Sequence, residues 1–116
     1  MHWKRQAVGK TPTLREGYIM PTYVALTNWT DQGVKNAKGA VDRSEQGRAA
    51  IEQAGGRVVG LWWTQGTYDA VLIVDWPDDE SASAFALSYA ATGNVRTQTM
   101  RAYTNEEMQR VLSKLP

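Results

Sequence analysis

RVVGLWWTQGTYDAVLIVDW, residues 57–76, is the stretch of sequence that decides the fold. Its two halves are rich in Val, Leu, Ile and Trp, which are residue types that favour strands. Between the halves, the sequence Gln65-Gly66-Thr67 supplies the glycine that a tight turn needs. We therefore predict a β-hairpin whose strands are Arg57–Thr64 and Tyr68–Trp76.

The segment before this hairpin predicts a strand followed by a helix. Residues 23–29 alternate as a strand does, and Thr30 is a residue type that caps a helix N-terminus. Gly55-Gly56 is suited to end the helix in a left-handed conformation. Helical spacing connects four apolar side chains of the predicted helix: Val34, Ala37, Val41 and Ile51.

The segment after the hairpin repeats the pattern and adds one more helix. Residues 77–80, with sequence PDDE, favour a helix start, and Gly93-Asn94 favours its end. Residues 95–103 read as a strand. Thr104 and Glu107 have the spacing of a capping box, which predicts a last helix with apolar side chains at Met108, Val111, Leu112 and Leu115.

The resulting order, β-α-β-β-α-β-α, predicts a ferredoxin-like α+β fold. In this split β-α-β arrangement, two helices cover one face of a four-stranded antiparallel sheet and leave the other face open. Alternation along the first strand places Val24 and Leu26 toward the helices and a second set on the open face, namely Tyr23, Ala25, Thr27 and Trp29. In the third strand, the set predicted to face the helices is Ala70, Leu72, Val74 and Trp76.

The adjacent pair Trp62-Trp63 places one indole on each face of the sheet, whichever face is the core. A small domain does not leave large aromatic side chains on an open sheet unless they serve an interface or a ligand groove. We therefore expect the chain to form a dimer or a higher homo-oligomer through its sheet.

Composition excludes several classes of function. The 116 residues contain no cysteine and one histidine, His2, so no disulfide, metal site, haem site or cysteine nucleophile is predicted, and no cofactor is expected. No apolar run approaches the roughly 20 residues that a bilayer requires, and no glycine-rich phosphate loop is present. The absence of cysteine fits a cytoplasmic location.

The net charge of +1 is unevenly distributed along the chain. Residues 1–19 carry four basic side chains and one acidic side chain, a net charge of +3, and the remaining nine basic and eleven acidic side chains give −2. We therefore divide the chain into a basic N-terminal arm or extension, residues 1–19, and a domain, residues 20–116. A mildly acidic domain does not predict nucleic-acid binding.

Four stretches of the sequence, in this order, carry a resemblance to a known family: MPTY (20–23), NWTDQG (28–33), GTYD (66–69) and GNVRTQTMRAYT (93–104). Together they resemble the GYD domain family, and the match runs from Met20 to about Leu115. The resemblance implies a dimeric α/β barrel, in which two ferredoxin-like subunits pair their open sheets. It also implies that Met20 corresponds to the usual first residue.

The resemblance implies a fold but no reaction. Neighbouring families include cofactor-independent monooxygenases, muconolactone isomerases, haem-binding chlorite dismutases and effector domains of transcriptional regulators, and a shared fold does not choose among them. A haem enzyme would need a histidine in the folded domain, and residues 20–116 have none.

Asp69 and its surroundings give three hypotheses. We expect a pocket between sheet and helices that binds a small aromatic or carboxylated metabolite, lined by Tyr23, Thr27, Trp29, Tyr68, Asp69, Thr97, Thr99 and Arg101. The first alternative is a cofactor-independent isomerase or monooxygenase-like enzyme with Asp69 as the base. The second is a structural or regulatory assembly module without a ligand, in which Asp69 accepts hydrogen bonds at the hairpin.

Overall fold

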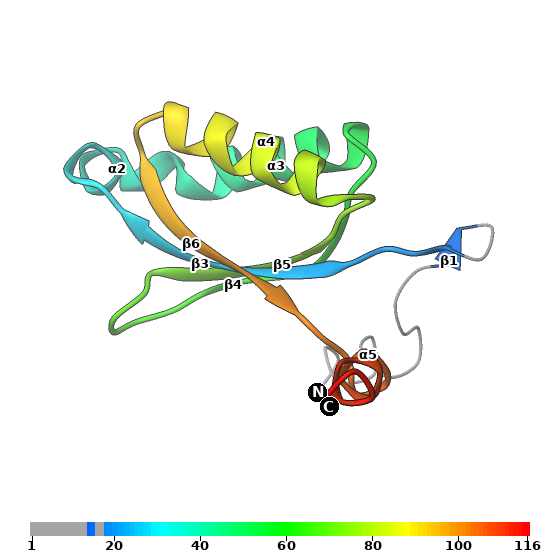
Figure 1. Ribbon diagram of the computed structural model, residues 1–116. Coiled ribbons are helices and arrows are strands. Elements are labelled where there is room, and N and C mark those ends of the chain that lie inside the picture. Colours follow the sequence, from blue (N-terminus) through cyan, green and yellow to red (C-terminus); the bar gives the residue numbers. More distant parts are fainter. Residues whose placement is uncertain (1–13, 16–17) are drawn as a thin grey trace.

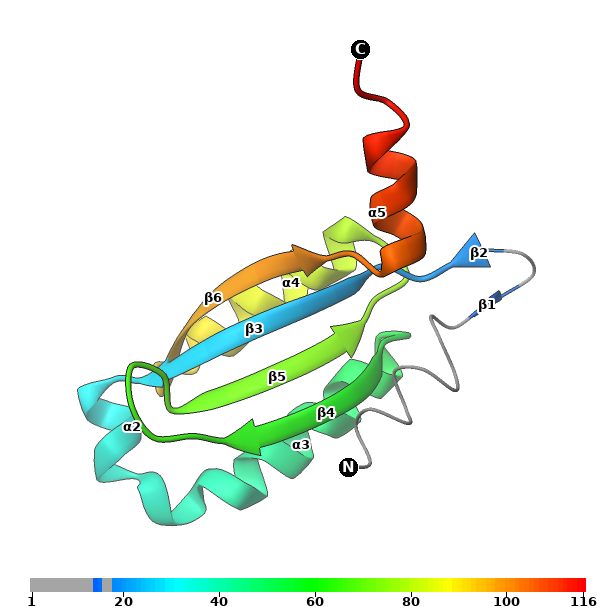
Figure 2. The ribbon, with the colours of Figure 1, turned by 90° about the horizontal axis from the view of Figure 1, so that it is seen from below.

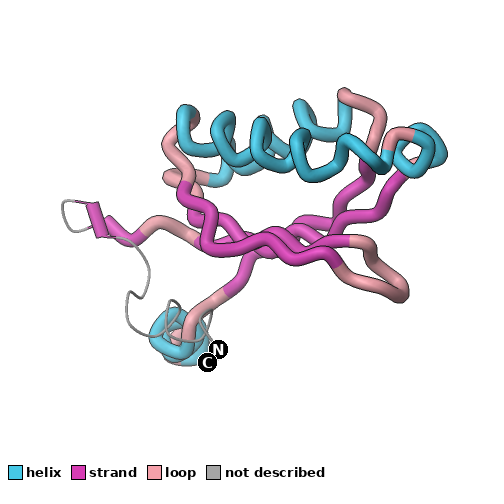
Figure 3. The backbone as a smooth tube through the Cα atoms, turned by 180° about the vertical axis from the view of Figure 1, so that it is seen from behind, coloured by secondary structure: helices cyan, strands magenta, loops and turns pink. Residues whose placement is uncertain are grey.

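A four-stranded antiparallel sheet with the order β4-β5-β3-β6 is the centre of the computed structural model, which describes residues 14–15 and 18–116. The strands are β3 (Thr22–Trp29), β4 (Arg57–Trp63), β5 (Ala70–Asp75) and β6 (Val95–Ala102). Two helices, α3 (Ala40–Gln53) and α4 (Asp79–Ala91), cover one face of the sheet (Figure 1). The backbone view from behind shows the same two layers (Figure 3). This arrangement confirms the predicted ferredoxin-like α+β fold.

The predicted arm falls mostly outside the described residues. Residues 1–13 and 16–17 are not described, and the remainder contributes two short strands, β1 (Leu14–Arg15) and β2 (Tyr18–Ile19), which pair antiparallel. The division into an arm and a domain therefore stays a prediction.

The single helix predicted after β3 is divided into three pieces. Thr30 caps α2 (Asp31–Lys35) by accepting the Gly33 N–H at 3.1 Å, and the 3-10 helix η1 (Ala37–Gly39) separates α2 from α3. A Cβ on Gly33 would lie 2.0 Å from the carbonyl oxygen of Asn94, so α2 is packed directly against the loop before β6.

This interruption corrects the predicted apolar face of the helix. Val34 and Val41 are 57% and 59% exposed, whereas Ile51 is buried as expected. The loop before β6 holds α2 in place, so α2 does not continue the axis of α3. Val34 therefore does not share a face with the apolar positions of α3. Within α3, Val41 and Ile51 are ten residues apart, which at 3.6 residues per turn places them on different faces of the helix.

The hairpin and the chain reversals follow the sequence closely. Gly66 in the hairpin has a φ of 118°, and Gly55 after α3 has a φ of 93°. Residues other than glycine rarely adopt such a backbone conformation. The register between β4 and β5 shifts between Val58 and Gly60, which marks a bulge.

The faces of β3 are the reverse of the prediction. Tyr23 is buried with Ile51 of α3 and Ala82 of α4, so Tyr23, Ala25, Thr27 and Trp29 point toward the helices. Val24 and Leu26 lie on the open face. Alternation separates a strand into two sets, but it does not say which set faces the helices. In β3 the aromatic set faces them, and the Tyr23 hydroxyl reaches the carboxylate of Asp79 at the start of α4.

The faces of β5 agree with the prediction. Leu72, Val74 and Trp76 pack in or against the core below the helices, together with Val58 of β4 and Phe85 of α4. The Trp pair is divided as expected. Trp63 lies on the helix side, and Trp62 pairs with Val71 on the open face.

The open face of the sheet carries apolar side chains beside polar ones such as Thr22, Gln98 and Asp75. Figure 2 views the molecule from this side, with α3 and α4 behind the strands. Cross-strand partners share a face, so the register brings together a set of apolar side chains, which we call the open-face patch: Val24, Leu26, Trp62, Val71, Ile73 and Met100. The ring of Trp62 lies over Gly60, where an added Cβ would meet it at 2.3 Å.

The last helix, α5 (Asn105–Leu112), lies apart from the other helices. It sits on the side of the sheet opposite to α3 and α4 (Figure 1) and projects past the β6 edge (Figure 2). The predicted capping box of Thr104 and Glu107 is present. Its apolar side chains are nevertheless exposed, at 43% for Met108, 39% for Val111 and 50% for Leu112.

Candidate functional site

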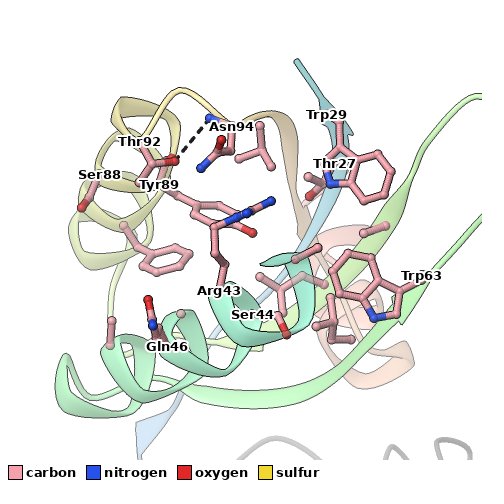
Figure 4. A pocket seen from close by; sticks show the side chains of 18 residues that line it. Thr27, Trp29, Arg43, Ser44, Gln46, Trp63, Ser88, Tyr89, Thr92 and Asn94 are labelled. Atoms are coloured by element: carbon pink, nitrogen blue, oxygen red, sulfur yellow. Dashed lines mark hydrogen bonds between the residues drawn. The ribbon is translucent and has the colours of Figure 1, made fainter. Parts of the chain in front are cut away.

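A cavity of about 230 Å³ lies between the sheet and the two covering helices (Figure 4). β3, β4, β5 and β6 form its floor, and α3 and α4 form its walls. Small residues on α3 leave this space open: Ala40 and Gly47 line it, and nothing lies within 4 Å of the position that a Cβ on Gly47 would occupy.

Two pairs of aromatic side chains lie on two sides of the cavity, which is partly open to solvent. Trp29 and Trp63 lie on the sheet side, with ring centroids 6.3 Å apart and an angle of 43° between the planes. Phe85 and Tyr89 of α4 stack at 5.4 Å and 25°. Flat apolar surfaces on two sides are suited to a planar group.

Arg43 supplies the charge in the lining. Its side chain extends from α3 toward the ring of Tyr89 (Figure 4), and one of its guanidinium nitrogens donates to the carbonyl oxygen of Asn36 at 2.8 Å. The ion pairs found among the described residues are Arg57 with Asp75 and Arg101 with Glu107. Within that part of the chain, Arg43 has no carboxylate partner.

Burial raises the pKa of the Tyr89 hydroxyl above its ordinary value, and the charge of Arg43 opposes the shift. A phenol is protonated at neutral pH even at its ordinary pKa, and the upward shift extends that state to higher pH. Tyr89 can therefore donate a hydrogen bond to an acceptor in the cavity. The neutral polar groups that complete the lining are Thr27, Ser44, Gln46, Ser88, Thr92 and Asn94.

The structure brings two of the eight predicted pocket residues into this cavity, Thr27 and Trp29. Thr97 and Thr99 occupy the same face of β6, opposite Thr27 and Ala25, but they do not line the cavity.

Tyr23 and Arg101 lie toward the other end of the sheet. Arg101 pairs with Glu107 at 3.2 Å and stacks over the rings of Tyr23 and Tyr103. These side chains connect the sheet to α4 and α5 and are distant from the cavity lining.

Tyr68 and Asp69 serve the hairpin. The Tyr68 hydroxyl donates to the side chain of Gln98 at 2.6 Å, and the Asp69 carboxylate accepts the backbone N–H of Trp29 at 2.9 Å. The Asp69 N–H in turn donates to the carbonyl oxygen of Thr27 at 2.8 Å. Asp69 thus joins the start of β5 to the end of β3 and lies outside the cavity lining.

The sequence analysis missed Arg43, Tyr89 and Trp63 as pocket residues. The spacing of Ala40, Arg43 and Gly47 in α3, and of Phe85 and Tyr89 in α4, was the available signal, because positions three and four apart share one face of a helix.

The described residues lack two kinds of functional feature. No cluster of three or more His, Cys, Asp or Glu side chains that could hold a metal ion was found there. In the same part of the chain, no helix is both long and apolar enough to cross a bilayer.

Comparison with known proteins identifies the family. The model of the GYD domain matches residues 23–112. A curated protein of Thermus thermophilus, the "Glutamine synthetase and cystathionine beta-lyase binding protein", is 31% identical over 84 residues, which is 72% of this chain and 88% of that protein. No solved structure matches the chain. With the predicted motifs, the observed fold and a family model that covers most of the sequence, the chain belongs to the GYD domain family.

Proposed function

We propose that this GYD-domain protein is a homo-oligomeric binding protein that holds a small molecule in the cavity between sheet and helices. The observation that carries the proposal is the composition of the lining. Two aromatic walls, formed by Trp29 with Trp63 and by Phe85 with Tyr89, face a space that also contains the cation of Arg43. Ligand sites are typically such apolar clefts with few polar groups to set orientation.

The size of the cavity supports a small ligand. Its volume of about 230 Å³ is below the roughly 300–1,000 Å³ that is usual for sites of drug-sized molecules. A single ring with a short substituent fits this size better than a nucleotide or a dinucleotide does.

Native mass spectrometry of two matched variants tests this proposal. Ser88 and Ser83 are both exposed on α4, but only Ser88 lines the cavity. We expect the purified Ser83→Phe variant to retain a small-molecule adduct or to bind small aromatic probes, and the Ser88→Phe variant to lose both. Equal behaviour of the two variants would place the ligand elsewhere.

Self-association is the second part of the proposal. The open-face patch exposes large side chains, including Trp62 at 37% and Met100 at 48%. Pairing of two such faces would remove these apolar groups from water, as in obligate dimer interfaces.

Protein binding is a second candidate function, and the printed name of the Thermus thermophilus relative favours it. The exposed apolar side of α5 offers a surface of the required kind. Purified glutamine synthetase and cystathionine beta-lyase, mixed separately with the full chain, test this candidate by sedimentation. Co-sedimentation with either enzyme, and its loss in Leu112→Glu, would support it, and independent sedimentation would contradict it.

An isomerase or oxygenase role for Asp69 stays a prediction, as does the cytoplasmic location. The hydrogen bond from Trp29 and the position of Asp69 outside the cavity lining favour a structural role for this carboxylate.

A further inference from the structure

The charge in the cavity restricts the class of ligand. Arg43 is the charged residue among the eighteen that line the cavity, and no Asp or Glu belongs to that described lining. A guanidinium carries five N–H donors. One terminal nitrogen of Arg43 donates a hydrogen bond to the carbonyl oxygen of Asn36. Arg43 therefore keeps donors for an anionic guest, and a cationic guest would meet like charge.

The aromatic walls restrict the class further. The Trp29–Trp63 pair and the stacked Phe85–Tyr89 pair present ring surfaces from opposite layers of the domain, the sheet and α4. Offset or tilted contact with such rings favours an aromatic guest over an aliphatic chain.

The hydrogen-bonding groups near Arg43 suit a monoanion. The Tyr89 phenol is protonated at neutral pH, as an ordinary tyrosine is, so it is a donor beside the guanidinium. The planar fork of a guanidinium matches both carboxylate and phosphate oxygens. The described lining holds one cation, which balances the single charge of a carboxylate but not the charge of up to about −2 on a phosphate monoester at neutral pH.

We propose that the cavity binds a small aromatic monocarboxylate, with Arg43 as the anchor of the carboxylate, Tyr89 as a second donor, and the ring held between the Trp29–Trp63 and Phe85–Tyr89 walls. This inference rests on the proposed ligand-binding function of the same cavity. It adds the class of the ligand and the residue that selects it.

Calorimetric titration of the full chain with three probes of nearly equal shape tests the inference. Benzoate carries the carboxylate, benzamide is its neutral counterpart, and benzamidine is its cationic counterpart. We expect benzoate to bind at least about 10-fold more tightly than benzamide, which corresponds to roughly 1.4 kcal/mol. We expect benzamidine to bind most weakly, because Arg43 repels it.

Two substitutions on α3 locate the selectivity. Arg43→Gln keeps a donor for the Asn36 carbonyl and removes the charge, whereas Arg48→Gln makes the same change at an exposed position outside the cavity lining. We expect Arg43→Gln to weaken benzoate by about 10-fold or more and to leave benzamide nearly unchanged. Arg48→Gln should change neither affinity. Tyr89→Phe keeps the ring and removes the hydroxyl donor, and we expect it to weaken the binding of benzoate but not of benzamide. This second variant keeps the test decisive if Arg43→Gln does not fold.

The outcomes separate the two proposals. Equal affinity for benzoate and benzamide, or unchanged benzoate binding in both Arg43→Gln and Tyr89→Phe, would overturn the inference about ligand class while the cavity remained a ligand site. Tighter binding of benzamidine would overturn it as well. Failure of all three probes, together with the absence of any adduct in native mass spectrometry, would overturn the ligand-binding function itself.

Discussion

Asp69 illustrates how one side chain can fix the path of a hairpin. Its carboxylate accepts a hydrogen bond from the backbone N–H of Trp29, and its own backbone N–H donates to the carbonyl oxygen of Thr27. Asp69 therefore joins the hairpin to β3 through two hydrogen bonds. The same bonds hold the backbone of Trp29, whose ring forms part of the cavity wall. Asp69, which the sequence suggested as a base, therefore affects the cavity indirectly, by holding the backbone of Trp29.

Asp69→Ala should lower the free energy of unfolding by about 1–3 kcal/mol, because the Trp29 N–H loses its acceptor. Asp69→Asn retains an acceptor oxygen and should cost less. Urea unfolding of the two variants measures the difference. Unchanged stability in Asp69→Ala, combined with loss of turnover of a ligand found in the native protein, would favour the catalytic alternative.

Residue-scale prediction from sequence succeeded where a side chain acts on its own neighbours. Thr30, Gly55, Gly66 and the Thr104–Glu107 box all behave as local rules require. Arg43 could not be found in this way, because its position relative to Tyr89 depends on how two helices lie on the sheet.

At the scale of elements, Gly33 of α2 and Gly47 of α3 differ in the space around them. Gly33 permits the close approach of α2 to the Asn94 carbonyl, whereas Gly47 lies where a Cβ has open space. The interruption between α2 and α3 and the reversed faces of β3 have one common origin. Each depends on contacts with another element, which the pattern of a single segment does not contain.

The same substitution at these two glycines should have opposite effects on stability. Gly47→Ala should raise the free energy of unfolding by up to about 1 kcal/mol, because Ala favours a helix interior over Gly. Gly33→Ala should lower it by about 1–3 kcal/mol, because the new methyl group would displace the loop before β6. Thermal denaturation of both variants tests this pair. Stabilisation by Gly33→Ala would show that α2 is not packed as described.

The attachment of α5 should depend on pH through Glu107. Burial opposes ionisation of Glu107, but the N–H of Thr104 and the guanidinium of Arg101 stabilise the carboxylate and hold its pKa below the ordinary value of a glutamate. A carboxyl group with a lowered pKa stabilises the folded state above its unfolded pKa, and the contribution is lost as the pH falls through the folded pKa.

The amide resonance of Thr104 reports on this dependence, because its N–H donates to Glu107 at 2.9 Å. We expect its chemical shift to be constant at neutral pH and to titrate only at acidic pH, below the ordinary range of a glutamate. In Glu107→Gln, the acidic transition should be absent. A transition that persists in Glu107→Gln would assign the effect to another group.

At the scale of the whole molecule, the fold was predictable because the order of the seven predicted strands and helices, each with a clear start and end in the sequence, is compatible with few topologies. The order of strands and helices followed from turn and cap signals, and the four family motifs strengthened it. The cavity was not predictable to the same extent. Its walls come from strands and helices that are distant in the sequence, and its volume depends on Gly47 and Ala40, which carry no chemical signal of their own.

Self-association should depend on the open-face patch and not on the helices. Ile73→Lys places a charge at the centre of the patch, next to Val24, and should convert the oligomer to a monomer. Val41→Lys makes a comparable change at an exposed position of α3 and should have no effect. Sedimentation of both variants and of the unaltered chain tests this. A 12.9 kDa species for the unaltered chain at micromolar concentration would exclude the dimer.

The position of α5 has a consequence for how the molecule can be divided. Helices as short as its eight residues are marginal alone in water, and α5 is attached through the capping box and the Arg101–Glu107 pair. Its peptide bonds can therefore become accessible to a protease through local opening, without unfolding of the sheet. A cut there would remove the exposed apolar side of α5 and leave the cavity intact, so limited proteolysis would separate the two proposed functions, partner binding through α5 and ligand binding in the cavity.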